Sequence, residues 1–153
     1  MSKVIVVDPN RCTGCRLCEV ACSVMKTGEL DASRSRIRVF EWDEEEVFLP
    51  ILCRRCEEPV CATVCPVNAI HRDDSGMVCV DRDRCVSCFS CVSACPNGAL
   101  HIDPVEQKVL RCDQCGGDPP CVRYCSEKAL EYVESDDWQA DRRRSGARNL
   151  YGK

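Results

Sequence analysis

Apolar residues in this protein occur in short runs that are separated by polar and cysteine-containing loops. One run, 4–7, leads into Val7-Asp8, and another, 77–80, leads into Val80-Asp81. Apolar runs of this length, bounded by turn residues, are typical of short β-strands. The pattern therefore predicts a fold made largely of short strands.

Three pairs of these runs predict β-hairpins, because the residues between the two runs of each pair favour turns. The pairs are 36–42 with 47–49 around the acidic residues 43–46, 70–72 with 77–80 around 73–76, and 100–102 with 108–110 around 103–107. A further pattern, in which Ala precedes Ile or Leu, recurs at 66–70, 96–100 and 126–130. It predicts the end of a short helix leading into a strand. Together these patterns favour an α+β fold of short elements.

Cysteine changes this picture more than any other residue type. The protein has 153 residues and 17 cysteines, 16 of which fall into four groups. The groups are Cys12, Cys15, Cys18 and Cys22; Cys53, Cys56, Cys61 and Cys65; Cys85, Cys88, Cys91 and Cys95; and Cys112, Cys115, Cys121 and Cys125. The first and third have the spacing C-x2-C-x2-C-x3-C, which bacterial-type ferredoxins use to hold a [4Fe-4S] cluster.

The spacing itself argues for a compact metal cluster. Three thiolates with two residues between each and the next cannot share one face of a helix or strand. The backbone must therefore wrap around one object as a loop. The fourth cysteine of the first group, Cys22, lies four residues beyond Cys18. That separation is about one helical turn, which lets the side chain reach a second object. We therefore expect each group to give three ligands to one cluster and one ligand to another.

Other uses of cysteine fit less well. A disulfide framework expects a secretory signal and usually an even count, but residues 1–8 are too short an apolar stretch and the count is odd. Structural zinc sites take C-x2-C pairs, and the triplets of the first and third groups would leave unpaired thiols. A thioredoxin-like pair would not need four groups. Cys79 stands alone in the run 77–80, and we interpret it as a small hydrophobic strand residue rather than a ligand.

Charge and composition narrow the function classes. The formal net charge is −4 with cysteine counted as neutral, and it becomes about −12 once sixteen thiolates and four oxidised clusters are included. Such a surface excludes nucleic acid as an expected partner. The eight aromatic residues are few for a core of this size, and four clusters would fill the missing volume. Reduced thiols and the lack of a membrane-spanning segment predict a soluble, cytoplasmic protein without direct membrane insertion.

The composition changes again after Val133. An acidic stretch, 134–137, precedes a basic end that is interspersed with aromatic residues. Two interpretations of residues 134–153 stay open: a disordered tail, or an arm that docks on a partner subunit. The anchors of such an arm would be Trp138, Arg142, Arg143, Arg144 and Tyr151.

Nothing in the sequence indicates catalysis of its own. It contains no G-x-G-x-x-G, no phosphate loop and no C-x3-C-x2-C radical motif, so no catalytic residue is predicted. Three hypotheses remain: an electron-transfer subunit of a larger oxidoreductase, a free-standing soluble polyferredoxin, and a zinc-binding interaction module.

The four groups in this order resemble the four-cluster electron-transfer subunits of the dimethyl sulfoxide reductase type. Ser35-Arg36-Ile37 and the segment from Pro50 to Cys61, P-x2-C-x2-C-x2-P-x-C, add to the resemblance, which covers about residues 3–133. It implies duplicated bacterial-type ferredoxin modules around four [4Fe-4S] clusters in a row. Ser23 and Ser126 depart from the family, since many ferredoxins have proline at these positions, and the backbone is expected to leave the fourth cysteine differently there.

In that family the first group pairs with the fourth, and the second with the third. The resemblance therefore implies four ligand sets, which we call sites 1 to 4. Site 1 has Cys12, Cys15, Cys18 and Cys125; site 2 has Cys22, Cys112, Cys115 and Cys121; site 3 has Cys53, Cys56, Cys61 and Cys95; site 4 has Cys65, Cys85, Cys88 and Cys91. The implied modules are 1–25 with 103–133, and 26–102 with a hairpin insertion, followed by the tail 134–153.

The resemblance also implies the partners. Single electrons would pass between a larger catalytic subunit and another carrier, which is a flavin- or NAD-linked subunit or a soluble ferredoxin. The family serves formate dehydrogenases, hydrogenases, carbon monoxide dehydrogenase and tungsten or molybdenum pterin enzymes. Because the sequence lacks long insertions, a C-terminal membrane helix and an export signal, a tungsten or molybdenum aldehyde oxidoreductase is the first choice of catalytic partner.

Overall fold

The computed structural model describes residues 3–42, 46–74 and 76–135. The proposed anchors Trp138, Arg142 to Arg144 and Tyr151 lie outside these ranges. The strands are β1 (Lys3–Val7), β2 (Arg38–Trp42), β3 (Val47–Ile51), β4 (Ile70–Arg72), β5 (Val78–Val80), β6 (His101–Ile102), β7 (Val109–Leu110) and β8 (Leu130–Glu134). The helices are α1 (Leu17–Thr27), α2 (Val60–Thr63), α3 (Ser90–Ala94) and α4 (Pro120–Arg123), with 3-10 turns η1 (Pro9–Arg11), η2 (Ala32–Arg34) and η3 (Gln114–Gly117).

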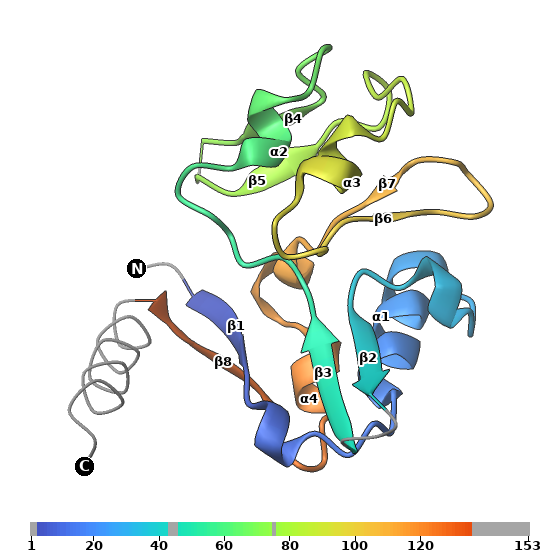
Figure 1. Ribbon diagram of the computed structural model, residues 1–153, viewed down its shortest axis with the longest axis vertical. Helices are drawn as coiled ribbons and strands as arrows, with labels where there is room; N and C mark the ends of the chain where they lie inside the picture. Colours follow the sequence, from blue (N-terminus) through green and yellow to red (C-terminus); the bar gives the residue numbers. More distant parts are fainter. Residues whose placement is uncertain (1–2, 43–45, 75, 136–153) are drawn as a thin grey trace.

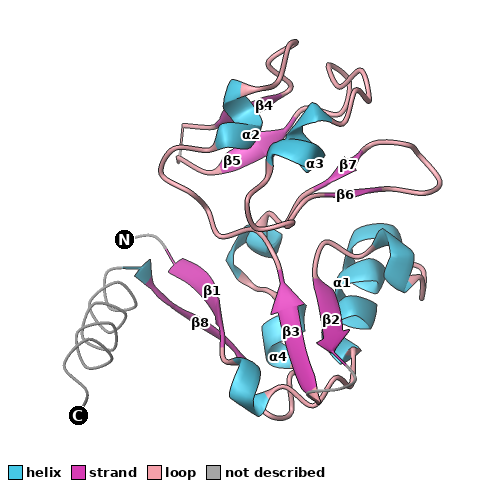
Figure 2. Cartoon of the chain, viewed as in Figure 1, coloured by secondary structure: helices cyan, strands magenta, loops and turns pink. Residues whose placement is uncertain are grey.

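The strands form four antiparallel pairs: β1–β8, β2–β3, β4–β5 and β6–β7. The three hairpins predicted from the sequence are therefore present, and the pairs are small, as Figure 2 shows. Two-stranded pairs are at best marginally stable alone, so they must pack on other elements. In the described residues no helix is long and apolar enough to cross a membrane.

The molecule has two halves, one of which is drawn above the other in Figure 1. The lower half, which we call the terminal half, holds β1, β8, β2, β3, α1 and α4. Its core combines aliphatic residues with cysteines: Ile5, Ile37, Val39, Leu52 and Leu130 pack with Cys18, Cys22 and Cys121. The pairing of β1 with β8, in which Val7 faces Leu130, brings the two ends of the described residues together.

The upper half, which we call the central half, holds α2, α3 and the hairpins β4–β5 and β6–β7. Its core consists of Ile70, Val78, Leu100 and Val109 around Cys91. Other cysteines, including Cys61 and Cys85, pack against its edge. In both halves the apolar side chains thus surround thiols, so burial of the aliphatic residues and placement of the cysteines occur together.

The residues that make up each core do not follow the module boundaries that the resemblance implied. The hairpin β2–β3 and the segment up to Leu52 belong to the core of the terminal half, although we expected residues 26–102 in one module. Conversely, Val109 on β7 packs in the central half, although we expected it in the module with residues 103–133. The physical reason is burial of Ile37, Val39 and Leu52, whose apolar side chains face Ile5 and Leu130.

The helices also differ from the prediction. We expected helix ends within 66–70, 96–100 and 126–130, but α2, α3 and α4 end before the fourth cysteine of their groups. The residues that follow form turns, in which Asn68, Gly98 and Lys128 have φ angles of 50°, 58° and 51°. A left-handed residue reverses the backbone and sends it into the next strand or extended segment.

Among the described residues, the longest helix occurs where proline is missing. After Cys95 the sequence continues with Pro96 and α3 has already ended, whereas after Cys22 it continues with Ser23 and α1 extends to Thr27. Ser23 is fully buried and its hydroxyl donates to the carbonyl of Val20 at 3.0 Å. Proline at this position would clash with the preceding turn of the helix. The expected difference is therefore seen at Ser23, as an α1 of 11 residues against 5 in α3, but not at Ser126, since the four-residue α4 ends before Cys125.

Candidate metal-cluster sites

Each cysteine group begins with a loop that has the same backbone device. The residue before the second cysteine has a positive φ in all four groups: 70° at Gly14, 53° at Arg55, 57° at Ser87 and 56° at Gln114. A left-handed residue at this position tightens the turn, so that neighbouring cysteine side chains can point to one side of the loop. At Gly14 the choice of residue is also steric, because a Cβ atom would lie 2.5 Å from the ring of Phe48.

The four cysteines of site 1 line one pocket. Cys12, Cys15 and Cys18 come from the first group, and Cys125 comes from the fourth. The pocket has about 360 Å³ of empty space, and its other walls include Val39, Pro50 and Leu130. The β1–β8 pairing makes this arrangement geometrically accessible, since it carries the first group next to the fourth.

The four cysteines of site 2 line a second pocket of about 310 Å³: Cys22, Cys112, Cys115 and Cys121. Ile5, Ile37 and Leu52 supply its apolar wall. Two cations, Lys26 and Arg36, also line it, and both contact Asp113. The Lys26 Nζ lies 2.7 Å from Asp113 Oδ1, and the Arg36 Nη1 lies 2.8 Å from Asp113 Oδ2. Site 2 therefore has positive charge at its edge.

The four cysteines of site 4 line a third pocket, with about 330 Å³ of empty space. They are Cys65, Cys85, Cys88 and Cys91, and the remaining wall is almost entirely apolar. Burial in such surroundings keeps water away from a bound group and strengthens electrostatic interactions inside the site.

Three cysteines of site 3 influence one another electrostatically. Cys53, Cys61 and Cys95 lie close enough to interact electrostatically, since the first and last of them both influence ionisation of Cys61. The fourth member, Cys56, is exposed, and its backbone carbonyl accepts a hydrogen bond of 2.9 Å from Arg72 Nη2. Exposure does not set Cys56 apart, since Cys15 of site 1 and Cys88 of site 4 are exposed as well.

Burial favours the protonated form of one thiol in each of sites 1, 2 and 4 when no metal is present. Burial raises the pKa of Cys18 to about 12, that of Cys112 to about 12 and that of Cys91 to about 11. A thiol binds iron only after it loses its proton, so a positively charged iron centre must stabilise the thiolate that burial disfavours. Closely placed sulfur ligands inside apolar walls fit a [4Fe-4S] cluster, which supplies that charge.

Backbone amides are aimed at the fourth cysteine of three groups. The amide of Arg36 donates to the Sγ of Cys22 at 3.3 Å, that of Ala69 to Cys65 at 3.2 Å, and that of Ala99 to Cys95 at 3.4 Å. At Cys65 burial opposes ionisation, but several such amides outweigh it and lower the pKa of the thiol. Hydrogen bonds to ligand sulfurs are one of the ways in which proteins tune cluster potentials. These amide donors were not predicted, although the recurring Ala-Ile/Leu pattern marks two of them.

Cys79 lies on β5 as predicted, but it is half-buried rather than fully packed. It pairs with His71 across β4–β5, and its Sγ lies 4.0 Å from the His71 Nε2. It also borders a polar pocket that Arg36, Arg82 and Arg111 line. None of the three cysteine-lined pockets described above includes it.

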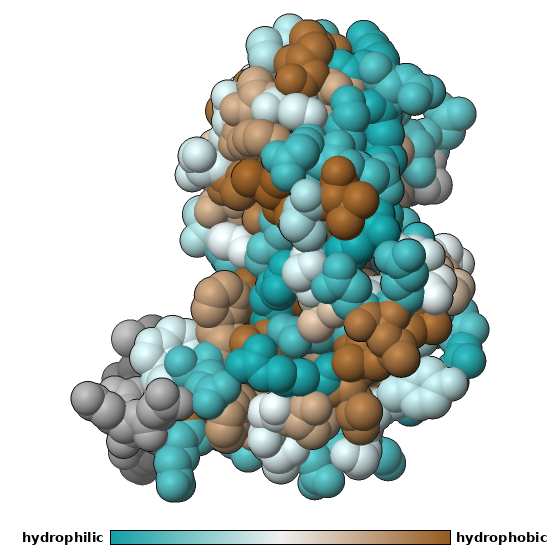
Figure 3. Space-filling model, turned by 90° about the vertical axis from the view of Figure 1, so that its right-hand side faces the viewer, coloured by the Kyte–Doolittle hydropathy of each residue, from teal (hydrophilic) through white to brown (hydrophobic). Residues whose placement is uncertain are grey.

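An apolar groove lies on the outer surface of the two helices that hold cysteines of sites 1 and 2. It is lined by Leu17, Val20, Ala21, Val24 and Met25 of α1 and by Pro120, Arg123 and Tyr124. Met25 is 57% exposed and Tyr124 is 59% exposed. Figure 3 shows a face of the molecule on which hydrophobic side chains gather in separate patches among hydrophilic ones.

Comparison with curated proteins finds subunits of oxidoreductases. This protein is 37% identical over 97 residues to the B subunit of the anaerobic dimethyl sulfoxide reductase of Escherichia coli (strain K12), with 56% of this sequence and 47% of that protein covered. It is 41% identical over 88 residues to the "aliphatic sulfonate oxidoreductase, polyferredoxin-like subunit" of Pyrococcus furiosus, with 57% and 50% covered. It thus spans about half the length of these relatives, and 20% of the length of the NADH-dependent phenylglyoxylate dehydrogenase subunit beta of Aromatoleum evansii.

A solved structure shares the fold. The protein superposes on one polypeptide of the active site complex BamBC of benzoyl coenzyme A reductase with a TM-score of 0.53 and 26% identity, covering 86% of this protein and 75% of that one. Two family profiles match the sequence: "4Fe-4S binding domain" over residues 4–26 and "4Fe-4S dicluster domain" over residues 44–135. With cysteine-lined pockets in both halves and a family match over more than half of its length, this protein belongs to the 4Fe-4S dicluster domain family.

Proposed function

We propose that this protein carries single electrons along four [4Fe-4S] clusters, as a non-catalytic subunit of a larger oxidoreductase. The observation that supports this most directly is the lining of the pockets. Each of three pockets has four cysteines, three from one group and one from another. These are the combinations that the resemblance implied for sites 1, 2 and 4, and we propose the sixteen cysteines of sites 1 to 4 as the ligands.

The order of the sites supports a row. Besides burial, which acts most strongly, Cys18 of site 1 contributes to the raised pKa of Cys121 in site 2. In the same way Cys53 of site 3 influences Cys112 of site 2, and Cys61 of site 3 influences Cys91 of site 4. Electrostatic influence of this kind requires proximity. The sequence of neighbours 1–2–3–4 is what a conduit for electrons needs.

The protein's own residues would hold, shield and tune the clusters, which supply the one-electron chemistry when bound. Cysteine thiolates hold them, the aliphatic walls exclude water, and the amides of Arg36, Ala69 and Ala99 donate to ligand sulfurs. None of these roles requires a substrate pocket or a proton donor. The arrangement therefore supports electron transfer without chemistry on a substrate.

We further propose that the two halves are duplicated ferredoxin modules, with residues 3–52 and 111–134 in one and residues 53–110 in the other. Equivalent contacts support this. The amide of Asp8 donates to the carbonyl of Ala129 at 2.8 Å, and the amide of Asp81 donates to that of Ala69 at 2.7 Å. In each case the Asp side chain also accepts from the amide two residues later, at 3.0 Å.

The proposed partner is a catalytic subunit of the tungsten or molybdenum pterin class, with an aldehyde oxidoreductase as the first choice. Relatives named as parts of reductases and dehydrogenases support a place in such a complex. The groove between α1 and α4 gives a surface for docking, because exposed apolar patches mark interaction sites. The proposed location is the cytoplasm, because its reducing conditions keep ligand thiols available for iron.

Two measurements test the proposal on protein purified anaerobically from its native source. Iron and acid-labile sulfide should each approach about sixteen atoms per polypeptide, as four cubes require. Electron paramagnetic resonance (EPR) spectra should show that the clusters can be reduced and reoxidised. A zinc-loaded protein, or iron for two cubes, would contradict it. Size-exclusion chromatography should show co-elution with a larger subunit. Met25→Glu should weaken that association and Leu30→Glu, at an exposed position outside the groove, should not.

A further inference from the structure

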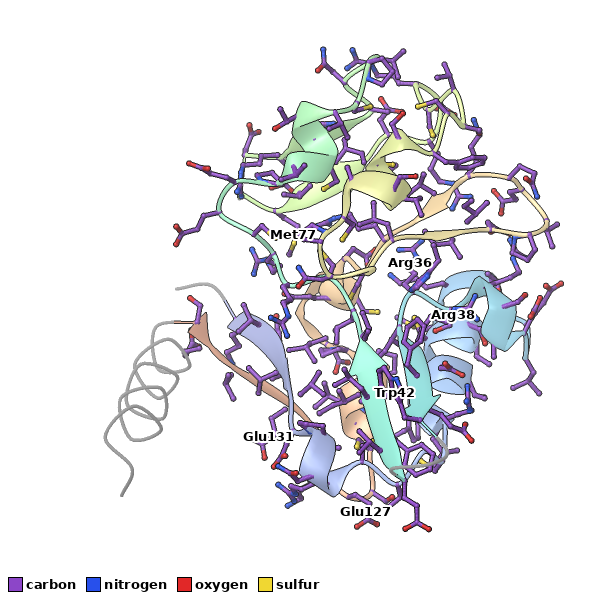
Figure 4. The ribbon with its side chains drawn as sticks, in the orientation of Figure 1. Arg36, Arg38, Trp42, Met77, Glu127 and Glu131 are labelled. Atoms are coloured by element: carbon purple, nitrogen blue, oxygen red, sulfur yellow. The ribbon has the colours of Figure 1, made fainter. Side chains whose placement is uncertain are left out.

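Two cations, Lys26 and Arg36, lie beside the cysteines of site 2. Both line the same pocket as the four thiols, and their side chains are only 16% and 18% exposed. Lys26 lies four residues after Cys22 on α1, so these two side chains share one face of the helix. The backbone amide of Arg36 donates to the Sγ of Cys22 at 3.3 Å, and Figure 4 shows Arg36 near the boundary of the two halves.

Asp113 ties both cations to the loop of the fourth cysteine group. Its carboxylate lies 2.7 Å from the Lys26 Nζ and 2.8 Å from the Arg36 Nη1. The same carboxylate accepts a hydrogen bond of 3.1 Å from the backbone amide of Cys115. The two cations therefore keep a fixed place beside the loop that carries Cys112 and Cys115. One carboxylate neutralises one of the two cations, so one positive charge remains in excess at this pocket.

The other two cysteine-lined pockets lack this excess charge in their linings. The lining of site 1 includes one cation, Arg16, and one carboxylate, Glu127. The lining of site 4 includes no acidic or basic side chain among the described residues. Lys108 donates to the backbone carbonyl of Cys85 but does not line that pocket. Of these three sites, site 2 is thus the one whose own lining is positively charged.

We propose that Lys26 and Arg36 raise the reduction potential of the cluster at site 2. The inference rests on the proposed function, because it requires a cluster at this site. A [4Fe-4S] cluster with four thiolate ligands carries a charge of about −2 when oxidised and about −3 when reduced. A fixed positive charge therefore stabilises the reduced form more, and the apolar wall of Ile5, Ile37 and Leu52 strengthens the effect. The two cations thus favour residence of the electron at site 2.

The experiment is a potentiometric titration of the full-length protein, followed by EPR. Lys26→Gln and Arg36→Gln each remove one positive charge, whereas Lys26→Arg keeps it. Lys3→Gln is the control, because Lys3 is exposed, pairs with Glu134 and lines none of the three cysteine pockets. The signal of site 2 is identified as the one that Cys115→Ser abolishes or alters.

We expect Lys26→Gln and Arg36→Gln to keep their iron, and the midpoint potential of site 2 to become more negative in both. A tenfold change in the reduction equilibrium, which is about 59 mV for one electron, is the size expected of each. Lys26→Arg and Lys3→Gln should titrate as the wild type does, because neither removes charge from the pocket.

The remaining outcomes each overturn the proposal. Titrations of both glutamine variants that overlay that of the wild type would do so, as would a shift confined to a cluster that Cys115→Ser leaves intact. An equal shift in Lys26→Arg would show that the shape of lysine matters rather than its charge. If one glutamine variant loses iron, the other decides by the same criterion; loss of the same cluster in both would make the cations necessary for holding the cluster rather than for its potential. A wild-type protein without four reducible clusters would instead contradict the proposed function.

Discussion

The Arg34 Nη2 lies 3.0 Å from the Asp103 Oδ2, and this ion pair joins the two halves of the molecule. The Arg34 Nε also donates to Asp103, at 3.2 Å, so the contact is a fork. The Asp103 side chain is 1% exposed. Burial opposes ionisation of Asp103, but hydrogen bonds from Arg34 and from two backbone amides outweigh it and lower the pKa of the carboxyl. Both partners therefore stay charged at neutral pH.

Removal of one partner of this ion pair should weaken the contact between the two halves and lower the free energy of unfolding. Asp103→Ala removes the buried partner of Arg34, which keeps its contacts with Glu29 and Glu106, and we expect a loss of roughly 1–3 kcal/mol in the free energy of unfolding. The control is Asp118→Ala, which removes the exposed pair with Arg123 and should cost less than about 1 kcal/mol. The measurement is anaerobic urea denaturation followed by visible absorbance. Equal effects of the two variants would contradict a joining role for Arg34 and Asp103.

Gly14→Ala should disturb site 1. The new Cβ would lie 2.5 Å from the ring of Phe48. In addition, residue 14 has a φ of 70°, which alanine adopts at a cost of about 1 kcal/mol even in open space. Gly98→Ala is the matched control, because Gly98 has a φ of 58° and nothing within 4 Å of the added atom. We expect less iron per polypeptide in Gly14→Ala and normal iron in Gly98→Ala. Normal iron and stability in both would show that the loop around Cys15 adapts.

Replacement of single cysteines separates ligands from the strand residue. Cys88→Ser should remove the cluster at site 4 or shift its potential, because Cys88 lines that pocket with three other thiols. Cys79→Ser should leave the iron content unchanged, because Cys79 lies on β5 and its sulfur contacts His71 and the carbonyl of Met77. Iron analysis and EPR spectra of the two proteins decide the matter. An equal loss of iron would make Cys79 a ligand.

His101 should make stability depend on pH. Burial, with a smaller effect from Arg38, lowers the pKa of His101 to about 4, whereas an unfolded histidine has a pKa of about 6.5. As the pH falls below that value, the unfolded state takes up a proton that the folded state does not, so stability falls. Between about pH 7.5 and 5.5 the loss should reach at most about 1 kcal/mol, because the side chain is only partly buried. His101→Gln should reduce this pH dependence in urea denaturation; an unchanged slope would contradict the assignment.

Sequence patterns predicted what depends on neighbours along the polypeptide. The hairpins at 38–51, 70–80 and 101–110 followed from short apolar runs and turn residues, and the cysteine spacing led to the iron–sulfur family. The sequence indicated only that α1 could be longer than the other helices, because Ser23 stands where a proline would stop the helix. Ser23 does not determine the residue at which the helix ends. The two cores divide at other residues than expected, since packing of Val39 and Leu52 is a matter of tertiary contact.

Electrostatic features were beyond sequence reasoning for a different reason. Arg34 and Asp103 are 69 positions apart, and neither belongs to a recognisable motif. In the sequence Arg111 is an ordinary basic residue before a cysteine. Its burial, with Nη1 donating to the carbonyls of Val78 and Cys112, is a property of the folded state.

The pairing of β1 with β8 has a consequence for how the protein is made. The central half is contiguous in sequence, so its cysteines all leave the ribosome before those of the fourth group do, and domains generally fold in the order of their synthesis. The terminal half needs Leu130–Glu134 before its first strand has a partner, and a long loop must close. Iron insertion during synthesis would therefore begin in the central half. Once residue 111 has emerged from the ribosome, the central half of the nascent polypeptide would already be competent to receive metal. At that moment Cys12, Cys15 and Cys18 would still lack Cys125 as their fourth partner.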